Sequence, residues 1–252
     1  MNHRVLLMLI GFFACLSIRA EEPAVRVAWD DYPPYQMTDT GPTRGIDMDI
    51  IDTILTKAGY RVSFVKMPWA RQLQSLAVGE LDIAMSASIS GDRARYVAWS
   101  TGYRRERAAL MAIHTPNPPI TALKDLIGSD RKVALIRDSS YPGEFAWLLT
   151  QAEFRALLEY TPQSINSLRM LQAGRVAFIL DDPVVIEFLG RQSNGTRPVI
   201  VLDVLNTAAH FMVSRKRLER LPALMGEIDT GIEQLTKDGT VRKVFEQYGT
   251  TP

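Results

Sequence analysis

The chain has 252 residues, of which 29 are Lys or Arg and 28 are Asp or Glu, so its formal net charge is +1. With 46% hydrophobic and 23% charged residues, 16 Gly, 14 Pro and one Cys, its composition excludes a disordered chain, a collagen, a disulfide-rich scaffold and a coiled coil. The near-zero charge argues against a nucleic-acid-binding protein, because such domains usually carry a clear basic excess. The length suits one large domain or two domains of roughly 100 residues each.

The first twenty residues have the pattern of an export signal. Arg4 precedes an apolar run at residues 5–16, which is too short to span a bilayer comfortably and is followed by small and polar residues. We therefore predict a cleaved signal peptide at residues 1–20, with cleavage after Ala20; the alternative is an uncleaved anchor. Cleavage would remove the single cysteine, Cys15, whose neighbours do not fit a lipidation site, and would change the formal charge to −1.

Strand and helix patterns alternate over the first half of the remaining chain. Pro33 and Pro34 fix an extended loop after the first strand, and Gly59 follows the first helix as a C-terminal cap would. The expected elements are strands at 25–29, 60–65 and 81–85 and helices at 46–58 and 69–78. This order is typical of an α/β domain in which helices cover a mainly parallel sheet.

A second α/β round follows a proline-rich connector at residues 116–119. The expected elements of the second half are strands at 108–113, 132–136, 176–180, 199–202 and 208–213 and helices at 144–149, 164–173, 222–237 and 241–248.

Signatures of common enzyme classes are missing from the sequence. No spacing resembles a zinc site, and we find no phosphate-binding loop or nucleophile elbow. Outside the signal only His114 and His210 remain, so we expect no metal and no cofactor. The basic run Arg104, Arg105 and Arg107 is interrupted by Glu106, which favours a solvated surface.

Polar residues gather where predicted strands end. Ser86, Ser88 and Arg93 follow the strand at 81–85, Ser139 and Ser140 follow the strand at 132–136, and Asp182 follows the strand at 176–180. Open α/β sheets bind ligands at the carboxyl ends of their strands, and a planar guanidinium donates two parallel hydrogen bonds to one carboxylate. Arg on one side and Asp on the other would suit a zwitterion.

Each of these residues also has a purely structural interpretation. Arg93 could pair with Asp92 or Glu106 at the surface, and Asp182 beside Pro183 could cap a helix. The serines could satisfy turn backbone.

Short motifs spread over residues 25–249 resemble the family 3 bacterial extracellular solute-binding proteins, which include periplasmic receptors for polar amino acids. The motifs are Tyr32-Pro33-Pro34-Tyr35, Gly45-Ile46-Asp47-Met48-Asp49, Gly79-Glu80-Leu81-Asp82, Ser88-Ile89-Ser90-Gly91-Asp92-Arg93, Gly174-Arg175-Val176 with Asp182, and Asp238-Gly239-Thr240 with Tyr248. The resemblance implies a two-lobed periplasmic binding protein fold of type II, in which two mainly parallel sheets flanked by helices are joined by two hinge strands. We expect lobe 1 at residues 21–112 and 208–252 and lobe 2 at residues 113–207.

The resemblance also implies roles for individual residues. Arg93, with Ser88 and Ser139 or Ser140, would hold a ligand α-carboxylate, and Asp182 would take the α-ammonium. Asp31, Tyr32, Trp69 and Ser86 complete the predicted ligand-binding set. Trp69 has helix packing as its alternative, and Arg71 is either a contact for a second anionic group or a solvated charge.

These expectations describe a periplasmic receptor that closes on an amino acid or a related carboxylate. We expect a monomer that delivers its ligand to an ABC transporter permease and binds no nucleic acid. One alternative is a periplasmic dehydratase on the same fold, with Glu144 or Asp138 as general acid. The other is a sensory binding module without a permease.

Overall fold

The computed structural model describes residues 23–38, 43–137, 139, 141, 143–193 and 195–250. The predicted signal peptide at residues 1–20, including Cys15 and the cleavage position, lies outside the described residues. So do Asp138 and Ser140.

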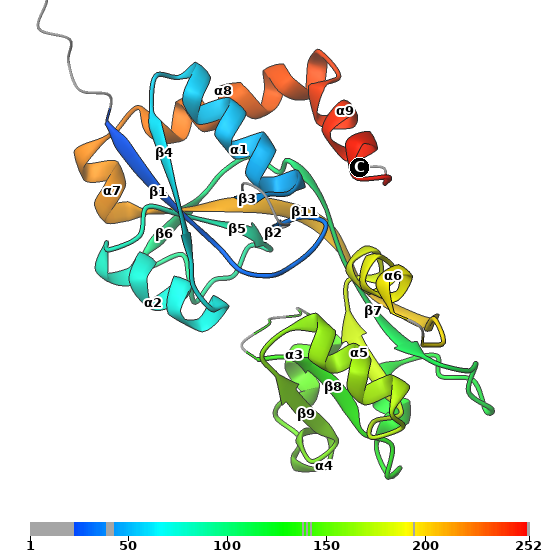
Figure 1. The fold of residues 1–252 in the computed structure, drawn as a ribbon. Helices are drawn as coiled ribbons and strands as arrows, with labels where there is room; N and C mark the ends of the chain where they lie inside the picture. The colour runs from blue at the N-terminus through cyan, green and yellow to red at the C-terminus, as the bar shows by residue number, and fades with distance from the viewer. Residues whose placement is uncertain are drawn as a thin grey trace, which may run out of the picture.

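The elements form two groups, each built on one part of a mixed sheet (Figure 1). In the first group, β1 lies between two parallel neighbours, β4 and β5, and β11 then pairs antiparallel with both β5 and β6. The strands are β1 (Ala24–Trp29), β4 (Arg61–Lys66), β5 (Ile83–Ala87), β6 (Val97–Trp99) and β11 (Val199–Ser214), with a short hairpin of β2 (Met37–Thr38) and β3 (Thr43–Arg44) beside them. The helices of this group are α1 (Ile46–Lys57), α2 (Trp69–Val78), α7 (Arg215–Arg220), α8 (Leu224–Lys237) and α9 (Thr240–Gln247).

The second group repeats this plan with shorter strands. There β8 lies between parallel neighbours β9 and β10, and β10 pairs antiparallel with β7. The strands are β7 (Arg104–Ala112), β8 (Val133–Ile136), β9 (Leu158–Thr161) and β10 (Phe178–Asp181). The helices are the 3-10 turn η1 (Leu123–Leu126), α3 (Glu144–Leu148), α4 (Ala152–Arg155), α5 (Ser164–Gln172) and α6 (Pro183–Gln192).

Strands β7 and β11 connect the two groups. They are paired antiparallel from Val199 opposite Ala112 to Ala209 opposite Arg104, and two register shifts interrupt the ladder. In Figure 1 they run together from the upper group to the lower one. A two-stranded antiparallel connection resists stretching but can bend and twist, which suits a hinge.

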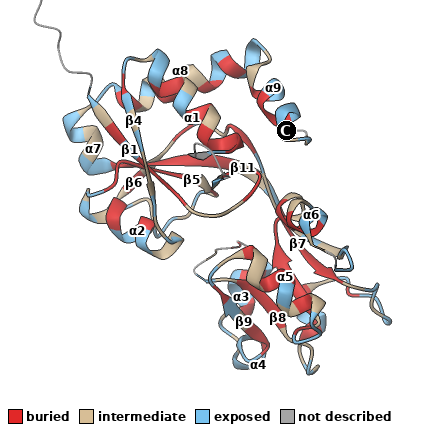
Figure 2. Ribbon diagram, viewed as in Figure 1, coloured by how far each residue is buried: buried red, intermediate tan, exposed pale blue. Residues whose placement is uncertain are grey.

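Apolar side chains hold each group together. The helix α1 buries Ile46, Ile50 and Ile54 on one face, as their helical spacing predicts. Figure 2 shows the central strands buried and the outer faces of the helices exposed. Each fully buried aliphatic side chain contributes roughly 1.5–3 kcal/mol relative to an exposed one.

Two sequence-based expectations about this sheet are wrong. The strands expected at 199–202 and 208–213 are one continuous strand, β11, because the polar residues between them pair with β7 where the strands cross between the groups. The basic run at 104–107 is not a solvated face, because β7 begins at Arg104 and alternate side chains there face the interior.

Candidate functional site

A cleft of about 840 Å³, part of it open to solvent, lies between the two groups of elements. Its walls come from the carboxyl ends of β1, β5, β8 and β10, from the start of α2, and from the crossing strand β7. This is the place where open α/β sheets collect ligand-binding side chains. The lining residues are Asp30, Asp31, Tyr32, Gln36, Trp69, Gln72, Met85, Ser86, Ala87, Ser88, Arg93, Glu106, Arg107, Ile136, Ser139, Tyr141, Pro162, Gln163, Asp181 and Asp182.

Every predicted ligand-binding residue that the structure describes lines this one cleft. The set contains Asp31, Tyr32, Trp69, Ser86, Ser88, Arg93, Ser139 and Asp182. Their roles toward a ligand remain predictions, and Ser140 lies outside the described residues.

Arg93, Trp69 and Ser88 form a polar and aromatic corner of the cleft. The guanidinium carbon of Arg93 lies 5.3 Å from the centre of the Trp69 ring, a distance at which a cation–π interaction stabilises both side chains. The Oγ atom of Ser88 is buried and has no hydrogen-bond partner among the described residues. Because a buried hydroxyl without a partner is costly, Ser88 is suited to donate to a ligand oxygen beside Arg93.

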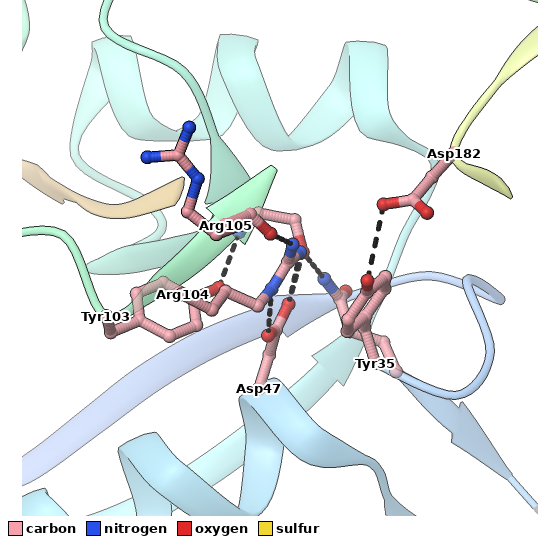
Figure 3. Close-up of polar contacts among 8 residues, drawn as sticks. Tyr35, Asp47, Tyr103, Arg104, Arg105 and Asp182 are labelled. Carbon is pink, nitrogen blue, oxygen red and sulfur yellow. Dashed lines mark hydrogen bonds and ion pairs between the residues drawn. The ribbon is translucent and has the colours of Figure 1, made fainter. Parts of the chain in front are cut away.

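Asp182 faces this corner from the other group. It is 1% exposed, and its Oδ1 atom accepts a hydrogen bond of 2.8 Å from the backbone N–H of Val184, so it is the N-cap of α6. Its Oδ2 atom accepts a hydrogen bond of 3.3 Å from the Tyr35 hydroxyl (Figure 3). The helix cap therefore uses Oδ1, whereas the contact with Tyr35 uses Oδ2. Burial raises the pKa of this carboxyl.

Arg104 and Asp47 form a buried ion pair next to the cleft-lining residue Ser86. Arg104 Nε donates to Asp47 Oδ1 at 2.8 Å and Arg104 Nη2 donates to Asp47 Oδ2 at 3.2 Å, with side-chain exposures of 1% and 0% (Figure 3). The ring of Tyr35 lies 3.7 Å from the Arg104 guanidinium carbon. Burial acts to lower the pKa of Arg104, but Asp47, together with Tyr103 and Tyr35, outweighs burial and raises this pKa well above its usual value. Arg104 is therefore a structural cation that orients Tyr35 toward Asp182.

The hydroxyl of Ser86 belongs to this network. It donates to Asp47 Oδ2 and accepts hydrogen bonds of 2.9 Å from both Gln36 Nε2 and Arg104 Nη2. One donor and two lone pairs are all that a hydroxyl has, so a ligand would meet this side chain only by displacing a partner. Ser86 also has a positive φ of 57°, a conformation that costs energy outside glycine and is common at functional sites.

Glycine at position 45 allows the loop that carries Tyr35 to lie against the start of α1. The backbone N–H of Asp47 donates 3.0 Å to the Tyr35 carbonyl, and Gly45 has a φ of 145°. A Cβ at this position would overlap the Tyr35 carbonyl oxygen. The Gly45-Ile46-Asp47 motif thus places both the loop and the buried carboxylate.

Glu106 and Asp181 are acids of the cleft that the sequence analysis did not assign. Burial raises the pKa of each to about 7. Nearby Arg104 acts against this shift at Glu106, and the Ser164 hydroxyl and the N–H of Asp182 do so at Asp181. The signal for Glu106 is its spacing, because in a strand it shares a face with Arg104 and Ala108. Extending the predicted strand from residue 108 back to Arg104 would have placed Glu106 on the same face of the strand as these two residues.

At the cleft mouth, Asp30 and Asp31 face Gln163 from the second group. Gln163 Nε2 lies 3.5 Å from Asp30 Oδ1 and 3.3 Å from Asp31 Oδ2, and Lys66 Nζ pairs with Asp31 at 2.6 Å. Burial raises the pKa of Asp30. The hydrogen bonds from Gln163 thus join the two groups of elements at the mouth of the cleft.

Other candidates lie away from the cleft. Arg71 is exposed on α2, which fits a solvated charge. His210 is buried, and its Nδ1 atom lies 2.7 Å from the Ser100 carbonyl. The Glu144 carboxylate accepts hydrogen bonds from the backbone of Leu123 and Lys124 at the start of η1 and is not in the cleft lining. Within the described ranges we find no cluster of His, Cys, Asp and Glu that could hold a metal ion, and no helix long and apolar enough to cross a membrane.

Comparison with known proteins identifies the family. Residues 25–251 match the sequence profile of the bacterial extracellular solute-binding proteins, family 3. The chain belongs to this family. The family prediction made from the short motifs is therefore confirmed.

Two curated relatives and one solved structure show how far the similarity extends. The arginine-binding periplasmic protein of Mannheimia haemolytica is 21% identical over 251 residues, covering 96% of this chain and 97% of that protein. The L-cystine-binding protein TcyA of Bacillus subtilis (strain 168) is 20% identical over 85% of this chain and 75% of its own length. A histidine kinase sensor domain with similarity to periplasmic binding proteins has a TM-score of 0.78 at 26% identity, covering 93% of this chain and 100% of that domain. The periplasmic-binding-protein fold is thus confirmed, and family 3 membership makes this chain a solute-binding protein.

Proposed function

We propose that this family 3 protein is a periplasmic receptor that captures an amino acid or a related carboxylate in its cleft. The observation that carries the proposal is that Arg93 and Ser88 from the first group and Asp182 from the second line the same cleft. A ligand with a carboxylate and an ammonium, such as an amino acid, would offer a partner of opposite charge to each side. The amino-acid-binding relatives support the same ligand class.

The cleft offers each part of such a ligand a partner. Arg93, Ser88 and Ser139 would hold the carboxylate, with Ser140 beside them in the sequence, and Asp182 would hold the ammonium. Tyr32, Trp69 and Asp31 would surround the ligand side chain, which Tyr32 and Trp69 can contact through their ring faces.

Capture would proceed by hinge closure. Lobe 1 would contain residues 21–112 and 208–252, lobe 2 would contain residues 113–207, and β7 and β11 would bend between them. A ligand that touches both lobes binds the closed state better than the open one and so shifts the population toward it.

After cleavage behind Ala20, the mature protein would be a monomer in the periplasm. The closed form would deliver its ligand to an ABC transporter permease in the inner membrane. Purified permease in nanodiscs should show ATP hydrolysis that rises with the loaded receptor. ATP hydrolysis that is unaffected by the receptor, combined with a direct response of a sensor kinase, would favour the sensory role that the similarity to a kinase sensor domain raises.

A thermal-shift screen tests ligand capture. Residues 21–252 would be screened against the twenty amino acids, small carboxylates and amines. A ligand at 1,000 times its Kd stabilises the folded state by about 4 kcal/mol, which raises Tm by about 8–16 °C for a protein of this size. Arg93→Ala should abolish the shift, whereas Arg71→Ala, which removes an exposed arginine near the same wall, should keep it. An unchanged shift in Arg93→Ala would exclude Arg93 from the site.

The dehydratase alternative has less support in the geometry. Of its two candidate acids, Glu144 lies at η1 outside the cleft lining. A general acid must reach the proton it transfers, which Glu144 cannot do from there, and Asp138 lies outside the described residues. Because the similar curated proteins are binding proteins, we propose that this protein binds its ligand without converting it.

A further inference from the structure

Glu106 lies in the cleft at a position that no structural role explains. It lies on β7, one of the two strands that cross between the groups, and its side chain lines the cleft. Its Oε2 atom is shielded from solvent and has no hydrogen-bond partner of good geometry among the described residues, although the nearby Ser88 hydroxyl favours its carboxylate form. Buried carboxylate oxygens are normally hydrogen-bonded, so this one is suited to a partner that arrives with the ligand.

The arginines near Glu106 are engaged elsewhere. Arg104 donates two N–H groups to Asp47 and another, over 2.8 Å, to the Arg105 carbonyl. Arg107 Nη2 lies 3.2 Å from Asp203 Oδ1. Over the described part of the chain, no Lys or Arg forms an ion pair with Glu106, Asp181 or Asp182.

Asp182 alone offers a ligand ammonium limited capacity. Its Oδ1 atom already accepts from Val184 and its Oδ2 atom from Tyr35, while an ammonium has three N–H groups to satisfy. Glu106 and Asp182 line the same cleft, and the charge of Asp182 favours the protonated form of Glu106. Tyr32 and Tyr141 line this cleft too, and the charges of both acids help to raise the pKa of each tyrosine hydroxyl.

We propose that Glu106 is a second anionic contact for the ligand ammonium, shared with Asp182, and that it gives up a proton when the ligand binds. This inference rests on the proposed function. Burial raises the pKa of Glu106 to about 7, so in the empty cleft its carboxyl group would be protonated through part of the neutral pH range. The arriving ammonium stabilises the carboxylate, and the released proton passes to solvent.

The charged and titratable groups that face Glu106 come from several elements. Arg104 and the Ser88 hydroxyl favour its carboxylate form, whereas Asp182 and Asp47 favour its protonated form. The neighbouring Asp181 has its pKa raised to the same region, so it is the competing source of any proton release. These groups belong to β7 (Arg104, Arg107), to α1 (Asp47), to the end of β10 (Asp181, Asp182) and to the loops that carry Tyr32 and Tyr141. On β11, the residue opposite Glu106 is Thr207, which is uncharged.

Calorimetric titrations with L-arginine and L-citrulline test the proposal, because both carry the ammonium and only arginine carries a charged side chain. Titrations between pH 5.5 and 8.5 would use the wild type, Glu106→Gln and Asp181→Asn. In the wild type, Kd for each ligand should rise as the pH falls below 7, with a slope that approaches tenfold per pH unit toward pH 5.5. At pH 6.5, measurements in buffers of different ionisation enthalpy should show release of about three quarters of a proton per ligand, which a group with a pKa of about 7 would provide.

The two variants separate the candidate groups. Glu106→Gln should flatten the pH dependence for both ligands and weaken binding at pH 8 by about tenfold or more, since a hydrogen bond to a charged group is lost. Asp181→Asn, an equal loss of charge, should keep the pH dependence. A slope that persists in Glu106→Gln, that disappears in Asp181→Asn instead, or that occurs with L-arginine alone would overturn the proposal. Failure of every amino acid in the thermal-shift screen would instead contradict the proposed function itself.

Discussion

The substitution Asp47→Asn should strongly destabilise the protein, because it leaves the Arg104 guanidinium buried without an anion. Asparagine keeps the size of the side chain, but Arg104 Nε and Nη2 lose their charged partner at sites that are 1% exposed or less. Removing one member of a buried ion pair costs about 3–5 kcal/mol, since the remaining charge keeps its desolvation cost. At about 2–4 °C per kcal/mol, Tm should fall by roughly 6–20 °C.

The assay is thermal and urea unfolding of residues 21–252 followed by circular dichroism at pH 7. The double variant Asp47→Leu with Arg104→Met removes both charges and should recover much of the loss, because similarly sized apolar pairs often replace buried ion pairs at little cost. The control is Arg191→Ala, which removes one member of an exposed pair with Glu187 and should change stability by less than about 1 kcal/mol. A loss below about 1 kcal/mol in Asp47→Asn would refute the reasoning. So would a double variant whose loss equals the sum of the losses in Asp47→Leu alone and Arg104→Met alone.

Two further predictions concern the loop and the acids of the cleft. Gly45→Ala should cost more than about 2 kcal/mol in urea unfolding, because it combines a φ of 145° with overlap on the Tyr35 carbonyl; Gly128→Ala, which has a φ of 82° but open space around it, should cost less. The empty protein should lose stability as the pH rises from about 5 to about 7. The folded state holds protons on Glu106 and Asp181 more tightly than the unfolded state does, and this advantage disappears once both groups are ionised in both states. Each group accounts for about 2–3 kcal/mol between pH 5 and 8, so Glu106→Gln should lose less stability than the wild type over this range, and an equal loss in both would contradict the assigned pKa.

Local sequence patterns were enough to predict the two α/β groups. In α1, the spacing of Ile46, Ile50 and Ile54 matches the buried face of the helix, because a helix repeats every 3.6 residues wherever it packs. The same rule does not apply at β11, where polar residues between two apolar runs hide a continuous strand. There the backbone pairing with β7 supplies the structure, and pairing between distant strands leaves little trace in either segment alone.

The cleft was predictable to the extent that it depends on strand ends. Ser88, Arg93 and Asp182 follow strands directly, so the sheet rule was enough to bring them together. Arg104 was not predictable in this way, because its partner Asp47 lies 57 residues earlier in the chain and only the folded structure removes both from water. Its neighbours Arg105 and Glu106 are both charged residues of the same short run, yet Arg105 is exposed and Glu106 lines the cleft.

Energy transfer across the cleft tests the central claim that a ligand bridging both walls closes the hinge. The chain after residue 20 contains no cysteine, so Gln74→Cys on α2 and Glu153→Cys on α4, both exposed, would carry a donor and an acceptor dye. Adding the amino acid that gives the largest thermal shift should raise the transfer efficiency along a saturable curve, and Arg93→Ala should abolish this response. Saturable binding of that amino acid without any change in transfer would contradict hinge closure.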